Sequence, residues 1–255
     1  QIKRFCMKVL ITGASSGIGK ELARSFSKRG ASLILAARRK DKLEELKNEL
    51  GGDIEVVICD LSKRKEVFAL YDRLKNSGID ILVNNAGFGL VSDFLSSDLG
   101  AELEMIETNA VAPHILTKLF YRDFVRGGKG RILNVASSAA FMPAGPYFST
   151  YYATKAYIYS LTRAVANEAK AHGVCISVLC PGPVKTEFDS RAGVASSLKG
   201  LDCADVAEYT VKKFLKGKEV IIPGASIRLL KFTTRFLSDR FAVTLTAKQQ
   251  KKKIK

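Results

Sequence analysis

The sequence has no tryptophan, only two histidines and only five cysteines among 255 residues. His114 and His172 belong to no zinc-binding pattern such as H-E-x-x-H. The odd number of cysteines shares neither metal-type nor disulfide-framework spacing; they are Cys6, Cys59, Cys175, Cys180 and Cys203. We therefore expect no metal site, and we expect reduced thiols in a cytoplasmic protein, packed as small apolar residues where they interrupt strands.

Long apolar runs are also missing. No stretch of about 18 apolar residues occurs that could span a membrane, and the first residues lack the apolar core of a signal peptide. Residues 1–6 precede Met7, where a strand is expected to begin at once. They are either an added remnant or an upstream extension, and both origins stay open.

Acidic residues are few compared with basic ones, and the net charge is +16. Half of that charge lies between Arg228 and Lys255, which hold nine basic residues and one acid, Asp239. Such charge suits nucleic acid, an anionic membrane surface or anionic ligands. No recognised nucleic-acid-binding module accompanies it, so we expect no nucleic-acid partner.

Short apolar runs alternate with segments whose apolar residues recur at helical spacing, for example Leu22 with Phe26 and Leu43 with Leu46. Strands that are apolar throughout and separated by helices indicate a parallel sheet covered on both faces. The sequence thus predicts a single α/β domain over residues 1–255, a Rossmann-like doubly wound sheet with helices on both faces. The seven expected strands are Lys8–Thr12, Ser32–Ala36, Ile54–Cys59, Ile81–Asn84, Gly130–Ala136, Cys175–Cys180 and Val220–Ile222.

A glycine-rich turn follows the first expected strand directly, reading T-G-A-S-S-G-I-G from Thr12 to Gly19. Glycines at a strand–helix junction allow a tight turn and a close backbone approach to a pyrophosphate. The helix N-terminus then offers free N–H groups to the phosphates. The alternative is an ordinary glycine-rich loop, but its position on the first strand of a β-α-β unit favours dinucleotide binding.

The spacing T-G-x-x-x-G-x-G resembles the short-chain dehydrogenase/reductase family. The resemblance recurs in N-N-A-G at Asn84–Gly87, in S-x12-Y-x3-K at Ser138, Tyr151 and Lys155, and in P-G…T at Pro181 and Thr186. It covers roughly residues 7–190. It implies an NADP(H)-dependent oxidoreductase that interconverts carbonyl and alcohol groups, working as a homodimer or homotetramer on a small-molecule substrate.

The preferred cofactor is read from the end of the second expected strand. NAD-binding units carry an acid there, whereas this strand ends in Arg38 and Arg39 with no acid before Asp41. A guanidinium can bond two oxygens of a 2′-phosphate, so the sequence predicts NADP(H). The alternative is a solvated basic helix start. Asp60 and Leu61 correspond to the family's adenine-contacting pair, and a structural capping role for Asp60 is compatible with that.

Tyr151 and Lys155 are four residues apart and share a helix face. An adjacent ammonium favours the phenolate form of a tyrosine and so suits it to acid–base catalysis. By resemblance, Tyr151 protonates the carbonyl oxygen, Lys155 also binds the nicotinamide ribose, Ser138 donates a hydrogen bond to the substrate oxygen, and Asn109 holds a water. Ser137 is the neighbouring alternative to Ser138.

The expected cofactor contacts combine the glycine turn, the arginines and the other family motifs. They are Gly13, Ser15, Ser16, Gly17, Ile18, Gly19, Arg38, Arg39, Asp60, Leu61, Asn85, Ala86, Gly87, Tyr151, Lys155, Pro181, Gly182, Val184 and Thr186.

Substrate choice in this family depends on segments that the motifs do not cover, namely the one after the sixth expected strand and the C-terminus. Residues 187–202 contain Gly193, Gly200 and several serines, which fits a mobile lid. Residues 226–255 form a basic amphipathic segment with apolar residues at roughly helical spacing. Its interpretations are a helix on the substrate side, a subunit interface, or peripheral contact with anionic lipid. A lipid-like substrate is one alternative, and a non-catalytic NADP(H) sensor or scaffold is the alternative function.

Overall fold

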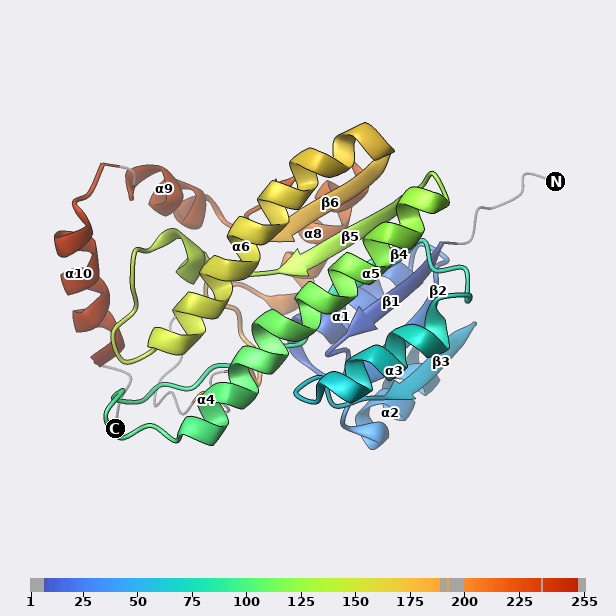
Figure 1. Cartoon of the computed structure of the whole chain (residues 1–255), viewed down its shortest axis with the longest axis horizontal. Helices are drawn as coiled ribbons and strands as arrows, with labels where there is room; N and C mark the ends of the chain where they lie inside the picture. Colours follow the sequence, from blue (N-terminus) through green and yellow to red (C-terminus); the bar gives the residue numbers. More distant parts are fainter. Residues whose placement is uncertain (1–6, 189–191, 193–199, 235, 252–255) are drawn as a thin grey trace.

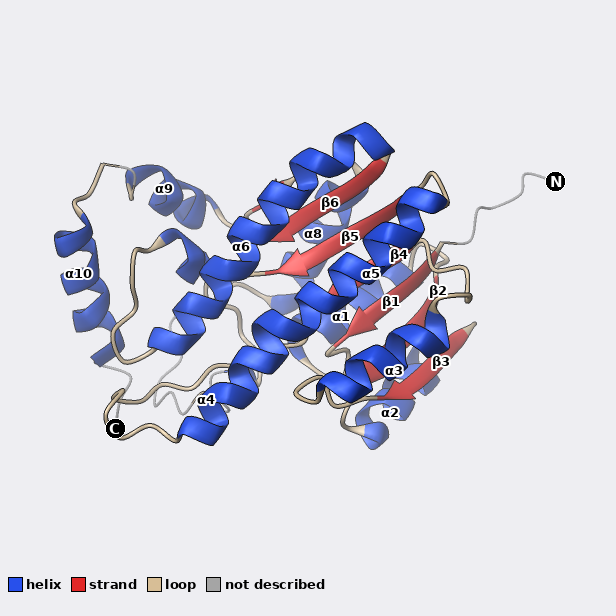
Figure 2. Cartoon of the chain, in the orientation of Figure 1, coloured by secondary structure: helices blue, strands red, loops and turns tan. Residues whose placement is uncertain are grey.

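The computed structural model describes residues 7–188, 192, 200–234 and 236–251. Within these residues, seven parallel strands form one sheet in the order β3-β2-β1-β4-β5-β6-β7 (Figure 2). The strands are β1 (Lys8–Thr12), β2 (Ser32–Ala37), β3 (Ile54–Ile58), β4 (Ile81–Asn84), β5 (Gly130–Val135), β6 (Val174–Leu179) and β7 (Val220–Ile221). The predicted doubly wound fold is confirmed, and the expected strand bounds differ by no more than one residue at either end.

Helices cover both faces of the sheet (Figure 1). One face carries α1 (Gly17–Ser27), α2 (Lys40–Leu50) and α8 (Cys203–Leu215). The other carries α3 (Arg64–Leu74), α5 (Ala112–Arg126) and α6 (Ser149–Ala169). The remaining elements are α4 (Leu99–Ile106), the π-helical turn η1 (Glu107–Val111), the 3-10 turns η2 (Ser138–Phe141) and η3 (Lys170–His172), and the helices α9 (Ala225–Thr233) and α10 (Asp239–Lys251).

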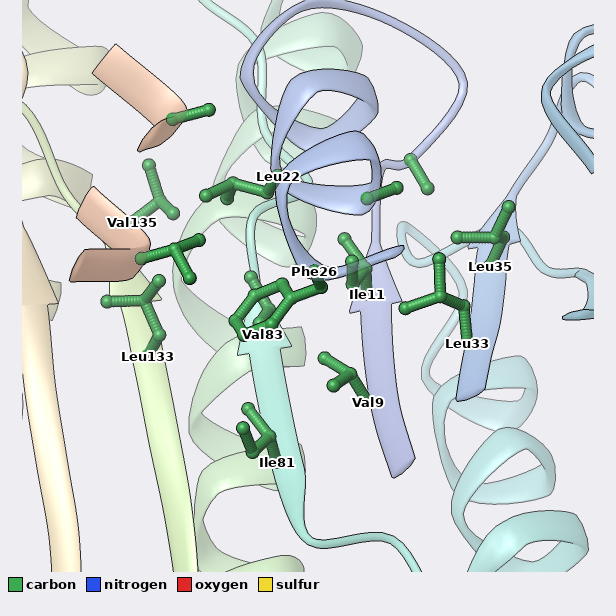
Figure 3. Close-up of a cluster of buried hydrophobic side chains, with 14 of the residues drawn as sticks. Val9, Ile11, Leu22, Phe26, Leu33, Leu35, Ile81, Val83, Leu133 and Val135 are labelled. Atoms are coloured by element: carbon green, nitrogen blue, oxygen red, sulfur yellow. The ribbon is translucent and has the colours of Figure 1, made fainter. Parts of the chain in front are cut away.

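Alternate residues of each strand enter the two cores, because side chains point to opposite faces of a strand. In β1, Val9 and Ile11 pack with Leu22 and Phe26 of α1 (Figure 3), whereas Leu10 enters the core on the α3–α5–α6 face. This is why the strands are apolar throughout rather than alternating.

The position of the site follows from the strand order. β1 pairs with β2 on one side and with β4 on the other, so successive crossovers leave β1 in opposite directions. In such sheets ligands bind in the crevice at the carboxyl ends of the strands on either side of the reversal. Figure 1 shows α9 and α10 beyond those same carboxyl ends.

The C-terminal segment is two helices rather than one. α9 ends at Thr233, and Ser238 precedes α10, where its hydroxyl accepts a hydrogen bond from the Phe241 amide at 3.4 Å. A serine in that position starts a new helix. Among the described helices, none is long and apolar enough to cross a bilayer.

Candidate active site

A cavity of about 430 Å³ opens at the carboxyl ends of the strands. Its walls come from the β1–α1 turn, the ends of β2 and β4, η2, α6, the segment after β6, and the helices α9 and α10. All residues predicted for the site line this cavity except Gly19 and Asn109, which lie behind its wall. The chain therefore brings the sequence motifs together in one place, although they are spread over residues 13–186.

The β1–α1 turn needs its glycines. Gly13 has a φ of 66°, and a Cβ there would come 2.7 Å from the Ala86 Cα. A Cβ on Gly19 would come 2.4 Å from the Gly13 carbonyl oxygen, which explains why Gly19 packs behind the turn. α1 begins at Gly17, and within the described chain the hydroxyl of Ser16 forms no capping hydrogen bond. The first-turn N–H groups are thus available to an anion.

Asn85 holds this turn against the end of β4. Its amide nitrogen donates to the carbonyl oxygens of Thr12 at 3.0 Å and Gly13 at 3.1 Å. The Thr12 hydroxyl in turn accepts from the backbone N–H groups of Asn85 at 3.0 Å and Ala86 at 3.2 Å. Thr12 is a positioning residue that sequence reasoning missed, although its place as the last residue of β1 was visible.

The two arginines flank the end of the cavity near β2. Arg38 lies 2.9 Å from Glu104 and 3.9 Å from Asp60, and Arg39 lies 3.0 Å from Glu187. These pairs are partly exposed, and exposed ion pairs contribute little. Both guanidiniums can therefore exchange a carboxylate partner for a phosphate.

Asp60 also has the structural role considered from the sequence. One of its carboxylate oxygens accepts hydrogen bonds from the backbone N–H of Ser62 at 3.1 Å and from the Ser62 hydroxyl at 2.8 Å. The Glu66 carboxylate accepts a further bond from the Asp60 N–H at 2.7 Å. These bonds hold the β3–α3 turn together where Asp60 and Leu61 line the cavity.

Tyr151 and Lys155 lie one turn apart on α6 and are both buried. The ammonium of Lys155 lies 5.7 Å from the centre of the Tyr151 ring and donates to the Val135 carbonyl at 3.0 Å. Burial lowers the pKa of Lys155 to about 8 because the charged form loses its hydration. The wall of the cavity thus holds, beside the tyrosine, a lysine whose charged form is disfavoured by burial.

Ser137 and Ser138 differ in the hydrogen bonds that hold them in place. The Ser137 hydroxyl accepts a hydrogen bond from the Ala139 N–H at 3.1 Å and caps η2. Ser138 begins η2, and its backbone N–H donates to the Pro181 carbonyl at 2.8 Å. This anchors Ser138 on the cavity wall, which Ser137 also lines, while the Ser137 hydroxyl caps the local turn.

Asn109 is buried in η1, where a π-helical turn interrupts the run from α4 to α5. Its oxygen accepts from the Phe88 N–H at 3.0 Å, and its nitrogen donates to the Phe88 carbonyl at 2.8 Å and to Thr154 at 3.3 Å. A Cβ on Gly87 would come 2.9 Å from the Asn109 oxygen and 3.3 Å from the Lys155 nitrogen. Asn109 therefore fixes the chain that passes over Lys155.

Aromatic rings that the sequence analysis did not single out surround Tyr151. Phe148 stacks on it, with ring centres 4.4 Å apart and planes 10° apart, and Phe188 lies at 5.4 Å. Phe148 is the last residue before α6 and lies three residues before Tyr151. The ring of the catalytic candidate is thus held between apolar neighbours.

The expected lid over residues 187–202 lies largely outside the described residues. Its two ends are tied together, because the Lys185 N–H donates to the Leu201 carbonyl at 3.1 Å and the Leu201 N–H to the Pro183 carbonyl at 3.0 Å. In the described chain, no group of three or more His, Cys, Asp and Glu side chains could hold a metal ion.

Comparison with known proteins agrees with this geometry. The model of the short chain dehydrogenase family matches residues 7–195. The uncharacterized oxidoreductase YvrD of Bacillus subtilis is 36% identical over 211 residues, which cover 82% of this chain and 77% of that protein.

Solved structures agree as well. A short-chain dehydrogenase from Sphingobium yanoikuyae in complex with NADPH is 30% identical with a TM-score of 0.82, over 90% of this chain and 93% of that one. A short chain dehydrogenase/reductase from Burkholderia phymatum in complex with NAD has a TM-score of 0.81 at 23% identity, over 92% and 94% of the two chains, and shows the likeness of fold alone. The chain is thus an oxidoreductase that belongs to the short-chain dehydrogenase/reductase family.

Proposed function

We propose that the protein is an NADPH-dependent carbonyl reductase in which Tyr151 is the general acid, or the general base in the alcohol-oxidising direction. The observation that carries this proposal is the buried ammonium of Lys155 one helical turn from Tyr151, on the wall of the cavity that the glycine turn also lines. Among the residues that the structure describes, no carboxylate forms an ion pair with this ammonium, and a buried cation without such a partner is costly. Its retention at this position is explained by a role toward the tyrosine and a bound ligand.

The cavity suits a dinucleotide. The β1–α1 turn offers first-turn N–H groups of α1, and the glycines leave no Cβ between the backbone and a pyrophosphate. At the β2 end, Arg38 and Arg39 present two guanidiniums, whereas NAD-type sites carry an acid there. Because one solved relative binds NADPH and another of the same fold binds NAD, the preference for NADP(H) rests on these arginines.

When bound, the cofactor would supply a hydride to the carbonyl carbon of the substrate. Tyr151 would give its hydroxyl proton to the carbonyl oxygen, so that one C–H bond and one O–H bond form and the C=O bond becomes a C–O bond. Ser138 would donate a hydrogen bond to the same oxygen, and Lys155 would hold the nicotinamide ribose and favour the phenolate that Tyr151 becomes. Asn109 would keep the segment over Lys155 in place and hold the water that connects it to solvent.

Phe148 and Phe188 would exclude water from the reacting atoms. Both rings lie against Tyr151, and a drier site strengthens the electrostatic interactions in it. Together with Met142, Ile227 and Leu230 they give the substrate side apolar walls. A carbonyl compound with an apolar body, including a lipid-like one, fits this lining.

The side chains of the C-terminal segment, residues 226–255, favour peripheral contact with an anionic membrane. Leu229, Phe232, Phe236 and Phe241 are between 57% and 75% exposed, and exposed basic residues accompany them, among them Arg228, Arg240, Lys248 and Lys251. Exposed apolar groups flanked by cations suit an anionic lipid surface. The cytoplasmic location and the homodimer or homotetramer expected from the sequence stay predictions.

The alternative of a non-catalytic NADP(H) sensor or scaffold has less support, since none of the relatives reported above is named as one. An assay separates the two functions. Purified protein is mixed with NADPH and with ketones, aldehydes, quinones and 3-oxoacyl compounds, and NADPH consumption is followed. We expect turnover of at least one ketone class; binding of NADPH without turnover of any compound would favour the sensor.

A further inference from the structure

The buried face of α10 is unusually polar. Ala242, Thr246 and Gln250 succeed one another at one residue per turn and are 2%, 2% and 3% exposed. Phe241 and Leu245 of the same helix are 57% and 49% exposed. The helix thus turns a threonine and a glutamine inward, leaves Phe241 outside and places the half-exposed Leu245 at the cavity, which is not the arrangement that burial alone favours.

Thr246 is satisfied locally, because its hydroxyl donates to the Ala242 carbonyl at 2.9 Å. Gln250 is satisfied at one end only. Its amide nitrogen donates to the Tyr152 hydroxyl at 2.8 Å, while among the described residues its buried amide oxygen accepts no hydrogen bond. Burying an amide oxygen without a donor is unfavourable, so its position needs a reason beyond packing.

The surroundings of Gln250 supply one. Gln250, Thr246 and Tyr152 line the cavity that Tyr151 and Lys155 also line. The ring of Tyr152 lies 6.4 Å from the ring of Tyr151. The neighbouring walls are apolar, as described above. The Gln250–Tyr152 pair is therefore a polar spot on the apolar side of the cavity, within the reach of a small molecule bound at Tyr151.

We infer that Gln250 is a specificity-determining residue whose amide oxygen accepts a hydrogen bond from a hydroxyl or amide N–H of the substrate. Tyr152 holds the amide at the wall of the cavity through the bond from the Gln250 nitrogen. The preferred substrate is then a carbonyl compound with an apolar body that carries one hydrogen-bond donor away from the reacting carbon. This inference rests on the proposed function and names the substrate class of the same site.

The test uses aryl alkyl ketones in matched pairs, in which the terminal methyl of one member is replaced by a hydroxyl or an acetamido group in the other. For the wild type we expect kcat/KM to favour the donor-bearing member at the best chain length by at least about tenfold. That factor is the one expected when a buried polar group is paired in one complex and left unpaired in the other. In Gln250→Met, which keeps the length of the side chain, the ratio should fall to near one. The loss should come mainly through a raised KM for the donor-bearing ketone.

Two further variants complete the experiment. Tyr152→Phe removes the partner of Gln250 and should lower the ratio partway, and Lys248→Met, a change to methionine at an exposed residue of α10 that does not line the cavity, should leave it as in the wild type. Gln250→Met removes the unpaired oxygen but also takes the Gln250 partner from the Tyr152 hydroxyl, so the melting temperature of each variant is measured without ligand. A lower melting temperature with an unchanged ratio would assign Gln250 a structural role.

The outcomes separate the two levels of the argument. Turnover of the ketones with a ratio that Gln250→Met leaves unchanged would overturn this inference alone. No turnover of any ketone would overturn the proposed function and the inference with it.

Discussion

Replacing Lys155 with methionine should stabilise the protein in the absence of cofactor. Lys155 is 4% exposed, and within the described part of the chain its ammonium donates a hydrogen bond to a backbone carbonyl, that of Val135. Burial lowers its pKa from 10.5 to about 8. That difference corresponds to about 3 kcal/mol of unfavourable free energy for the charged form in the folded state. At pH 7, Lys155→Met should therefore raise the free energy of unfolding by up to about 3 kcal/mol.

The pH dependence has a definite sign. Below about pH 8 the lysine is charged in both the folded and the unfolded chain, so the wild type carries the full penalty. Between about pH 8 and 10.5 the unfolded chain still holds the proton that the folded protein has lost. Unfolding then takes up a proton, so wild-type stability rises with pH relative to the variant. The advantage of Lys155→Met should shrink across this window.

Urea unfolding of the cofactor-free protein at pH 7, 8, 9 and 10 measures this difference. Lys118→Met, a change at an exposed lysine of α5, is the matched control and should show no advantage that depends on pH. If Lys155→Met were no more stable than the wild type at pH 7, or if its advantage did not change up to pH 10, the account of Lys155 as a strained buried cation would be refuted.

Two further predictions concern the cofactor preference and the C-terminal segment. Arg38→Asp should lower the affinity for NADPH roughly ten- to a hundred-fold more than the affinity for NADH, because a charge-assisted hydrogen bond to the 2′-phosphate is lost. Equal losses of affinity for the two dinucleotides, measured by fluorescence titration, would show that Arg38 does not contact the 2′-phosphate. The protein should co-sediment with phosphatidylserine vesicles at low salt and be released at high salt, and Phe232→Ser with Phe236→Ser should weaken this. If sedimentation depended neither on salt nor on these substitutions, residues 226–255 would be assigned to packing or to a subunit interface instead.

The fold was predictable because its signals are local. Each strand is a short apolar run beside its own turn residues, and the glycine turn lies directly after β1, so the strand bounds were predicted to within one residue. The doubly wound sheet was predicted but the order of its strands was not, because that order depends on pairing between segments far apart in the sequence. The break between α9 and α10 escaped prediction, since Ser238 looked like any polar residue within a helical spacing of apolar ones.

The site was predictable where motifs repeat the family pattern and not where distant segments meet. Gln250 lies 98 residues from its partner Tyr152, and nothing near it in sequence marks it as part of a cavity. No family motif falls in residues 248–255, yet Gln250 lies on the cavity wall. Phe148 and Thr12 lie beside predicted residues, but their roles depend on ring stacking and on the neighbour strand β4.

The central claim, that Tyr151 delivers the proton, is tested most directly by a single turnover. Enzyme loaded with NADPH is mixed with a saturating ketone substrate, and NADPH oxidation is followed by stopped-flow in the wild type and in Tyr151→Phe, with NADPH affinity measured in parallel. Tyr157→Phe, an exposed tyrosine on the same helix, is the control. The account predicts a rate about 10²–10⁴-fold lower in Tyr151→Phe with unchanged NADPH affinity. A rate within about tenfold of the wild type would contradict it.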